Sequence, residues 1–484
     1  MSVNHIRNIL LISLSCLLIL LVFSFFQMPI DIDESWLGEQ AYFLSSLGYV
    51  KSNLFEGLLH YEKRMLVFHK GFIFTGSLFS KVLGFELFSL RLVSLFFGLI
   101  LLGLVYLYLK STGRRQLWPW TALILLLCPL FFRHLKFYRP EMMLAATGFL
   151  SFLFLNYFFQ SERRGWLLLA GVFAGLSVWV HLNGLIFFGA GAITLAAFRR
   201  FSPFCFFCCS ATLFSLLYFL DVNSQWDLFL YQFKNEPSGA GINLSWYQPF
   251  LNLLTEHKRL FRKPEIIGIT SFFVFGSLVR FKILKSKLTQ EEGVLWIYTL
   301  SLIFLLGLIA HSKTTKYAIP LFPFFSIIGV GNFSSAWSRK EELQQELKTA
   351  FLVFLSLYFI FGVFSNLSFQ GLSPLRAFEA NDRIAQHIPE GKRILAPMSF
   401  IFGTPKKQVV VGLHGAELVS RSLNKPWNAH TLCSYAKDHQ FNYIVLNDEH
   451  KNKLCSGNGS CSFSCPGFAS AVIEGELQLF SWEG

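Results

Sequence analysis

The feature that most constrains the fold of this chain is a series of apolar segments, most of them about 20 residues long. A helix of about 20 apolar residues crosses the hydrocarbon core of a bilayer, which is about 30 Å thick. Only 15% of the 484 residues are charged, whereas soluble domains carry about 25%. The sequence therefore predicts a polytopic α-helical membrane protein with eleven spans. We place these spans at residues 7–29, 87–109, 117–132, 141–160, 165–180, 183–198, 203–221, 265–281, 293–310, 317–334 and 349–366.

The charge of the short loops predicts the orientation. Residues 66–84 are amphipathic and form either a twelfth span or a helix lying in the membrane interface. If they lie in the interface and the N-terminus is cytoplasmic, the net basic loops all fall inside, as membrane proteins prefer. We therefore expect eleven spans with residues 30–86, residues 222–264 and the C-terminal region outside. The first span lacks a small-residue cleavage site and is expected to be retained. The basic loops are "KSTGRR", "SERR", "FRR", "RFKILKSK" and "SRKEELQQELK".

The C-terminal quarter has a different character and is expected to form a separate domain. We place the membrane domain at residues 1–366 and this extracytoplasmic domain at residues 367–484. "RAFEANDRIAQHIPEGKRILAP" predicts a helix, a turn and a strand, and "CSYAKDHQFNYIVLND" predicts a helix and a strand. "AVIEGELQLFSW" is typical of a closing hairpin. Helices that alternate with apolar strands indicate a small α/β domain.

Four of the nine cysteines lie in this C-terminal domain, and an even number in an oxidising compartment favours disulfides. Zinc binding is the alternative, but no histidine stands at ligand spacing within "CSGNGSCSFSC". The other five cysteines lie in apolar spans, where we expect them only to pack. The predicted disulfide cysteines are Cys433, Cys455, Cys461 and Cys465.

The formal net charge of +13 does not indicate nucleic-acid binding. From residue 369 onward, 11 Lys and Arg face 10 Asp and Glu, so the excess lies in the membrane domain. No basic tract interleaved with aromatic residues stands on a soluble face. Orientation in the membrane and contact with anionic lipid explain the charge better.

Ionisable residues gather where the predicted topology brings four turns to the outer surface. Charges at membrane depth are costly and usually functional. The first outer loop opens with the carboxylates of "IDIDESWLGEQ", namely Asp31, Asp33, Glu34 and Glu39. The same loop adds Lys70, and Arg91 follows at the mouth of the second span. The other three turns contribute mostly Lys, Arg and His. Their residues are Arg133, His134, Lys136, Arg139, Glu141, His181, Asn183, His311, Lys313, Lys316 and Tyr317.

This mixture suits a site that holds a phosphate and removes a proton from a hydroxyl. Arg and Lys neutralise a phosphate, and a carboxylate acts as general base. No P-loop or dinucleotide glycine fingerprint is present for a nucleotide. If residues 31 and 33 enter a helix, they lie about 200° apart around its axis, so they do not both face one centre.

Several motifs occur in an order that resembles the GT-C membrane glycosyltransferases. The motifs are "DE" in the first loop, "HKG", "RL", "YRPE", "H-x-N-G" and "K-x-x-K-Y-x-x-P-x-x-P". The chain is similar to bacterial protein O-mannosyltransferases and to the aminoarabinose transferases that modify lipid A. The similarity covers nearly the whole chain, including an outer α/β domain. It implies a bacterial plasma-membrane enzyme of the cell envelope.

The resemblance also implies substrates and residue roles. The donor would be a sugar linked to a polyprenyl phosphate. The acceptor would be a protein, lipid A or another glycan, reached from the outer face. No metal-ligating residues are implied, and whether the reaction needs a divalent cation is left open. Asp33 would be the general base of an inverting transfer, with Glu34 and Glu141 as further catalytic carboxylates. Two departures leave the donor sugar open: Lys316 stands where relatives often have Arg, and His181 where many have Lys. The implied substrate-binding residues are Lys70, Arg91, Arg139, His181, Asn183, Lys313, Lys316 and Tyr317.

Each assignment has a simpler alternative. Asp33 could cap a helix, and Glu141 could favour a helix N-terminus. Arg91 could pair with an acid without touching substrate, and Asp31 and Glu39 could be solvated charges. Arg133 and Lys136 are expected to anchor at the interface. A secondary transporter or flippase for a lipid-linked or anionic substrate is the alternative function, but it would place charges near the bilayer midplane within an internal repeat.

Overall fold

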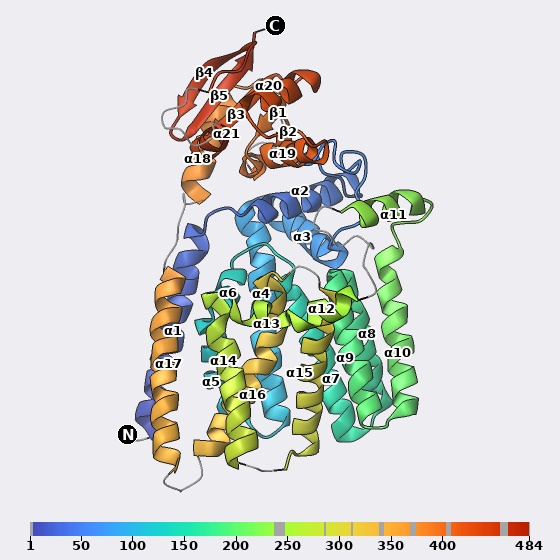
Figure 1. Ribbon diagram of the computed structural model, residues 1–484, viewed down its shortest axis with the longest axis vertical. Coiled ribbons are helices and arrows are strands. Elements are labelled where there is room, and N and C mark those ends of the chain that lie inside the picture. The colour runs from blue at the N-terminus through green and yellow to red at the C-terminus, as the bar shows by residue number, and fades with distance from the viewer. Residues whose placement is uncertain are drawn as a thin grey trace.

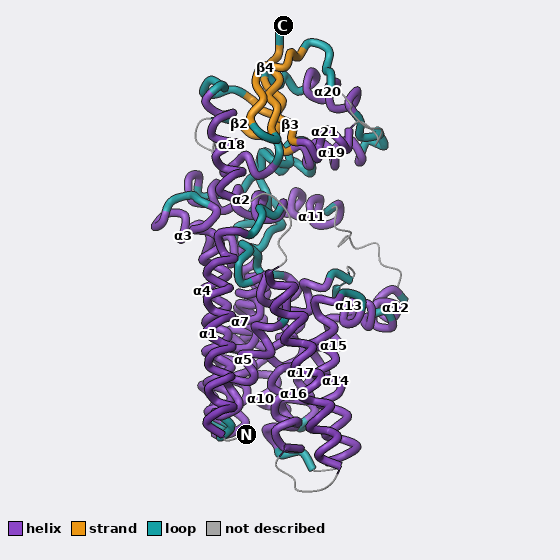
Figure 2. The backbone as a smooth tube through the Cα atoms, turned by 90° about the vertical axis from the view of Figure 1, so that its left-hand side faces the viewer, coloured by secondary structure: helices purple, strands orange, loops and turns teal. Residues whose placement is uncertain are grey.

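The computed structural model describes residues 3–236, 247–284, 287–310, 313–337, 343–367, 374–402, 408–454 and 463–483. A bundle of helices stands beneath a small domain that contains a β-sheet (Figures 1 and 2). Seven stretches of helix in the described chain are long and apolar enough to cross a membrane, and shorter apolar helices accompany them. The chain is thus an integral membrane protein.

Each of the eleven predicted spans contains a helix of this bundle. The segment at 117–132 is broken where Pro129 follows the extended residue Cys128, because proline cannot continue the hydrogen bonds of a helix. A short helix, α6 (Pro129–His134), follows the break. The bundle helices are α1 (Val3–Gln27), α4 (Leu87–Ser111), α5 (Trp118–Leu127), α7 (Glu141–Ser161), α8 (Arg164–Val180), α9 (Leu185–Ala197), α10 (Phe201–Ser215), α14 (Pro264–Leu278), α15 (Gln290–Ile309), α16 (Phe322–Trp337) and α17 (Leu343–Leu367).

Two helices of the first long loop, α2 (Ile32–Leu47) and α3 (Lys70–Leu83), lie at the end of the bundle that carries the small domain (Figure 1). One side of α3 is buried, while Phe74, Leu78 and Val82 are exposed. This is the arrangement that an interfacial helix requires. The N-terminus and the turns from α7 to α8 and from α9 to α10 lie at the opposite end (Figure 1).

We expect the two ends of the bundle to face different sides of the membrane. A variant with serine in place of the exposed Cys16, Cys205 and Cys209 would carry one new cysteine, at Lys63 or at Arg163. An impermeant maleimide should label Lys63→Cys in intact cells and Arg163→Cys only after permeabilisation, because the basic loops stay inside. Labelling of Arg163→Cys alone in intact cells would reverse the orientation.

The small domain contains a mixed five-stranded sheet of order β2-β1-β3-β5-β4. Strands β1 (Arg393–Ala396), β2 (Val409–Gly412) and β3 (Tyr443–Asn447) are parallel, and β4 (Phe468–Glu474) and β5 (Leu477–Trp482) form an antiparallel hairpin. The predicted α/β fold class is confirmed. The helices are α18 (Pro374–Gln386), α19 (Leu413–Ser422), α20 (Ala429–Asp438) and α21 (Asp448–Leu454).

A buried glutamate holds the loop on which this domain docks. Glu39 is 1% exposed and accepts hydrogen bonds from the Ser52 hydroxyl at 2.5 Å and from the Leu54 amide at 3.1 Å. The Leu54 carbonyl in turn accepts from the Gly412 amide at 3.1 Å. A Cβ on Gly415 would stand 2.1 Å from the same carbonyl oxygen, so this contact requires glycine. Glu39 is therefore not a solvated charge: it links α2 to the start of α19.

Glu39 gives the protein a predicted pH dependence. Burial raises the pKa of Glu39 from 4.5 to about 8, although its hydrogen bonds oppose the shift. Between these values the folded protein binds a proton that the unfolded chain has released, so stability falls as pH rises through this window. We expect Glu39→Gln to flatten the fall in thermal midpoint between about pH 5 and about pH 9. An unaltered slope in Glu39→Gln would contradict this.

A disulfide joins Cys433 on α20 to Cys465, with the Cα atoms 5.7 Å apart. Cys455 and Cys461 lie outside the described residues, so their pairing stays a prediction. The bridge closes a loop with a sequence separation of 32. We expect Cys433→Ser to destabilise the small domain by about 2–4 kcal/mol, and Cys209→Ser on the bundle surface to have little effect. Limited proteolysis measures the loss, and a free Cys433 thiol in peptide maps of the wild type would contradict the bridge.

Candidate functional site

The site begins where the chain leaves α1 and enters α2. Asp31 is the N-cap of α2, and its side chain accepts from the Asp33 amide at 2.8 Å. The Glu34 carboxylate accepts from the Asp31 amide at 3.0 Å, which completes a capping box. This box fixes the first turn of the helix. It leaves the Asp33 side chain 38% exposed, whereas Glu34 is fully buried.

Arg139 lies among three carboxylates. Its Nη1 forms an ion pair with Asp33 and is 3.9 Å from Asp31 Oδ1, and its Nε and Nη2 donate to the Glu141 carboxylate at 3.3 and 3.1 Å. The expectation that Asp31 and Asp33 do not face one centre is thus wrong, because Asp31 precedes the helix as its N-cap. Ser94 on α4 accepts from the Arg139 amide at 3.2 Å and donates to its carbonyl at 3.1 Å. Arg139 is thus held in place through both its side chain and its backbone. Glu141, the first residue of α7, is 1% exposed.

Lys316 closes the cluster from the far end of the sequence. It lies on the short 3₁₀ helix η5 (Thr315–Leu321), and its Nζ is 3.3 Å from the Asp33 carboxylate. Its side chain is 28% exposed. Asp33 therefore accepts from two cations at a partly open position. The sequence-predicted residues that meet here are Asp33, Arg139, Glu141 and Lys316, which we call the Asp33 cluster.

A stack of rings lies beside the Asp33 cluster. The rings of His69 and His181 are stacked with centroids 4.4 Å apart, and Tyr317 meets His181 edge-on at 5.7 Å. Burial lowers the pKa of His69 to about 4, which outweighs the attraction of Glu141. Burial also lowers the pKa of His181. Both imidazoles are therefore neutral near pH 7. The backbone N–H of Asn183 donates to His181 Nδ1 at 2.9 Å.

The structure gives Glu34 and Arg91 a different position. Arg91 Nη2 is 2.7 Å from Glu34 Oε2, and both side chains are 0% exposed. Glu34 also accepts from the Tyr138 amide at 2.9 Å, and Arg91 donates to the carbonyls of Met28 and Pro29. In this structure neither side chain faces an open surface. The pair joins the end of α1, the start of α2 and α4.

Two further predicted binding residues are engaged away from the cluster. Lys70, the first residue of α3, pairs with Asp221 and lies 4.6 Å from the centroid of the Tyr218 ring. Burial lowers the pKa of Lys70, and Asp221 opposes that shift. Lys313 donates to Glu256 on α13 (Glu256–Phe261) at 2.7 Å. The two lysines of the "KTTK" turn thus have different partners.

Sequence reasoning missed several of these partners. Asp221 could have been found, because it is an acid at the end of the seventh predicted span. His69 could have been found because it directly precedes Lys70. No feature of the sequence singled out Glu256. The prediction that Lys136 anchors at the interface was wrong. Its side chain is 1% exposed and donates to the Ser24 hydroxyl at 2.8 Å. His311 lies outside the described residues.

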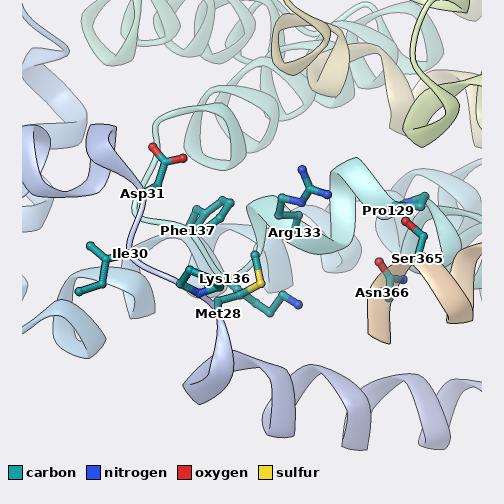
Figure 3. A pocket seen from close by; sticks show the side chains of 10 residues that line it. Met28, Ile30, Asp31, Pro129, Arg133, Lys136, Phe137, Ser365 and Asn366 are labelled. Atoms are coloured by element: carbon teal, nitrogen blue, oxygen red, sulfur yellow. The ribbon is translucent and has the colours of Figure 1, made fainter. Parts of the chain in front are cut away.

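A cavity of about 370 Å³ opens next to the start of α2. Figure 3 shows Asp31 at one end of it, Pro129, Ser365 and Asn366 at the other, and Arg133 between. Arg133 is 3.1 Å from Glu265 on α14. Among the described residues, no group of three or more His, Cys, Asp or Glu side chains could hold a metal ion. The cavity is lined by Met28, Pro29, Ile30, Asp31, Pro129, Arg133, Lys136, Phe137, Ser365 and Asn366.

Comparison with known families gives a match over the part of the chain that runs from α3 through α10. Residues 71–226 match the model of the dolichyl-phosphate-mannose-protein mannosyltransferase family. No curated protein sequence matches the chain significantly.

Solved structures match nearly the whole chain. ArnT from Cupriavidus metallidurans bound to undecaprenyl phosphate has a TM-score of 0.63 at 12% identity, with 98% of each chain covered. Its apo state has a TM-score of 0.60 at 12% identity, with 99% of this chain and 98% of that chain covered. The archaeal oligosaccharyltransferase AglB from Archaeoglobus fulgidus, in complex with an inhibitory peptide and a dolichol-phosphate, has a TM-score of 0.53 at 12% identity, covering 90% of this chain and 69% of that chain. The chain thus has the GT-C fold, and the predicted resemblance is confirmed.

Proposed function

We propose that this protein is a membrane glycosyltransferase that moves a sugar from a polyprenyl-phosphate donor to an acceptor hydroxyl or phosphate. The reaction takes place at the end of the bundle that carries the α/β domain. The observation that carries the proposal is the Asp33 cluster: a partly exposed carboxylate held by Arg139 and Lys316. Two cations that can neutralise a phosphate and a carboxylate that can accept a proton thus lie together where a lipid headgroup and a soluble acceptor can both arrive.

The chemistry follows from the charges. The acceptor hydroxyl oxygen attacks the anomeric carbon of the donor sugar and gives its proton to Asp33. The bond between the anomeric carbon and the phosphate oxygen breaks, and polyprenyl phosphate leaves with the bonding electrons. Lys316 and Arg139 neutralise the leaving phosphate. A single displacement of this kind inverts the anomeric configuration.

The shared cations link donor binding to the basicity of Asp33. Lys316 and Arg139 both contact the same Asp33 oxygen, Oδ2, so Oδ1 is the oxygen that takes the acceptor proton. A donor phosphate that takes over Lys316 removes one cation from Asp33 and makes it a stronger base. Glu141 keeps Arg139 in place through two hydrogen bonds while this exchange occurs. Glu141 and Glu34 are positioning residues in this proposal, and Asp33 is the base.

The comparisons support the donor class. The similar ArnT and AglB structures hold undecaprenyl phosphate and dolichol-phosphate, and the matching family model is described by a dolichyl-phosphate-linked sugar. A transporter or flippase is less favoured, because the Asp33 cluster lies at one end of the bundle rather than midway along its helices. We expect the N-terminal end of the bundle to be cytoplasmic, in a bacterial plasma membrane.

Mass spectrometry of surface glycans tests the proposal in cells. Cells that lack the protein should lose one sugar from a surface protein, lipid A or another glycan. Wild-type protein should restore that sugar, and Asp33→Asn protein expressed at the same level should not. Identical glycan profiles in all three strains would contradict the proposal.

A further inference from the structure

A second cavity, of about 170 Å³, lies between the start of α2 and the α/β domain. On the domain side it is lined where the parallel strands end: Pro397 follows β1, His414 follows β2, and Asn447 ends β3. In the order β2-β1-β3 the chain crosses from one side of β1 to the other. Open α/β sheets bind ligands at such a switch point, beyond the carboxyl ends of the strands.

The opposite wall of this cavity comes from the membrane domain. It is formed by Ile30, Asp31, Ile32 and Ser35. Ser35 is 1% exposed, and its hydroxyl has no hydrogen-bond partner in the described part of the chain. A buried hydroxyl without a partner is costly unless a ligand or water supplies one. Asp31 lines this cavity and also lies 3.9 Å from Arg139, the partner of Asp33, so a ligand in this cavity lies next to the Asp33 cluster.

The charges in the cavity disfavour an anion. Asp31, Glu417 and Glu449 contribute three carboxylates, against the single lysine Lys453. Lys453 is itself 2.7 Å from Glu417. A phosphate would meet more negative than positive charge here.

The remaining groups suit an uncharged ligand rich in hydroxyls. Burial lowers the pKa of His414 and of His450, although Glu417 and Glu449 respectively oppose it. A neutral imidazole offers one donor and one acceptor, and Ser35 and Asn447 add further polar groups. A peptide would pair its backbone with a free strand edge, but β1 and β3 are interior strands of the sheet.

We propose that this cavity binds one sugar unit of a saccharide acceptor and presents the adjoining hydroxyl to Asp33. The inference rests on the proposed glycosyltransferase function and specifies its acceptor. The α/β domain thereby supplies acceptor recognition, while the bundle supplies donor binding and the base.

Binding and turnover can be tested separately. Saturation-transfer NMR would use the full chain in nanodiscs, without sugar-based detergents, and the methyl glycosides of mannose, glucose, galactose and N-acetylglucosamine. We expect at least one glycoside to receive saturation from wild-type protein and equally from Asp33→Asn. His414→Ala and Lys453→Met should each weaken the signal by about fivefold, as expected for one lost hydrogen bond. His387→Ala, exposed in the same domain, is the matched control.

Three results would overturn the acceptor assignment: no glycoside receives saturation, the signal persists in both cavity variants, or glycerol phosphate or a blocked threonine amide binds in their place. Asp33→Asn should bind a glycoside even though it transfers little sugar, so the binding result does not depend on turnover. A failed binding test with normal turnover would refute only the acceptor site.

Discussion

Asp33→Asn should lower sugar transfer by about 10²–10⁴-fold, the amount that a positioned general base typically supplies. Asparagine keeps the size of the side chain but accepts no proton from the acceptor. It also loses the ion pairs with Arg139 and Lys316. The rate would be measured in proteoliposomes with a labelled polyprenyl-phosphate sugar and with membranes from cells lacking the protein as the acceptor source.

Asp31→Asn is the matched control, two residues away. Asp31 caps α2, and asparagine caps a helix about as well as aspartate. Asp31 also lines the proposed acceptor cavity and lies 3.9 Å from Arg139, so we expect a loss of rate of about tenfold or less, well below that of Asp33→Asn, because asparagine still forms hydrogen bonds. If Asp33→Asn transfers sugar at a near-normal rate, the base lies elsewhere, and Glu141→Gln is the next variant to measure.

Glu34→Gln should destabilise the protein by about 3–5 kcal/mol, the cost of breaking a buried ion pair. It leaves Arg91 charged and without exposed surface, beside neutral partners only. The loss would appear as a lower thermal midpoint and as a lower yield of folded protein in detergent. Replacing both partners, as Glu34→Leu with Arg91→Met, should recover much of it, because no unpaired charge then remains.

A more exposed ion pair provides the comparison for this effect. The side chains of Arg133 and Glu265 are 37% and 25% exposed, at 3.1 Å. Glu265→Gln should cost about 1 kcal/mol or less, since solvent screens such pairs. Equal costs for Glu34→Gln and Glu265→Gln would contradict a special role for burial at the start of α2.

The general fold could be predicted because hydropathy and loop charge depend only on short, continuous stretches of the sequence. All eleven apolar segments contain helices, and the strand at "NYIVLN" and the closing hairpin were expected from short motifs. Strand β2 and helix α19 were missed, since "VVVG" is short and passes directly into the helix. The break at Pro129 was also missed, although proline at such a position was its signal.

The pairing of charges could not be predicted, because it depends on which side chain each turn directs inward. Lys313 and Lys316 are three residues apart, yet one reaches Glu256 and the other Asp33. Asp33 and Glu34 are adjacent, yet Glu34 is enclosed by Arg91 while Asp33 stays partly open. The sequence placed these residues at one membrane surface, and only the structure separates the Asp33 cluster from its supports.

The most direct measurement is the release of polyprenyl phosphate from a panel of labelled polyprenyl-phosphate sugars by purified protein in proteoliposomes. We predict that wild-type protein consumes at least one donor and labels the acceptor membranes, at a rate about 100-fold or more above that of Asp33→Asn. Movement of intact donor across the bilayer, with no donor consumed and no difference between wild type and Asp33→Asn, would contradict the glycosyltransferase function.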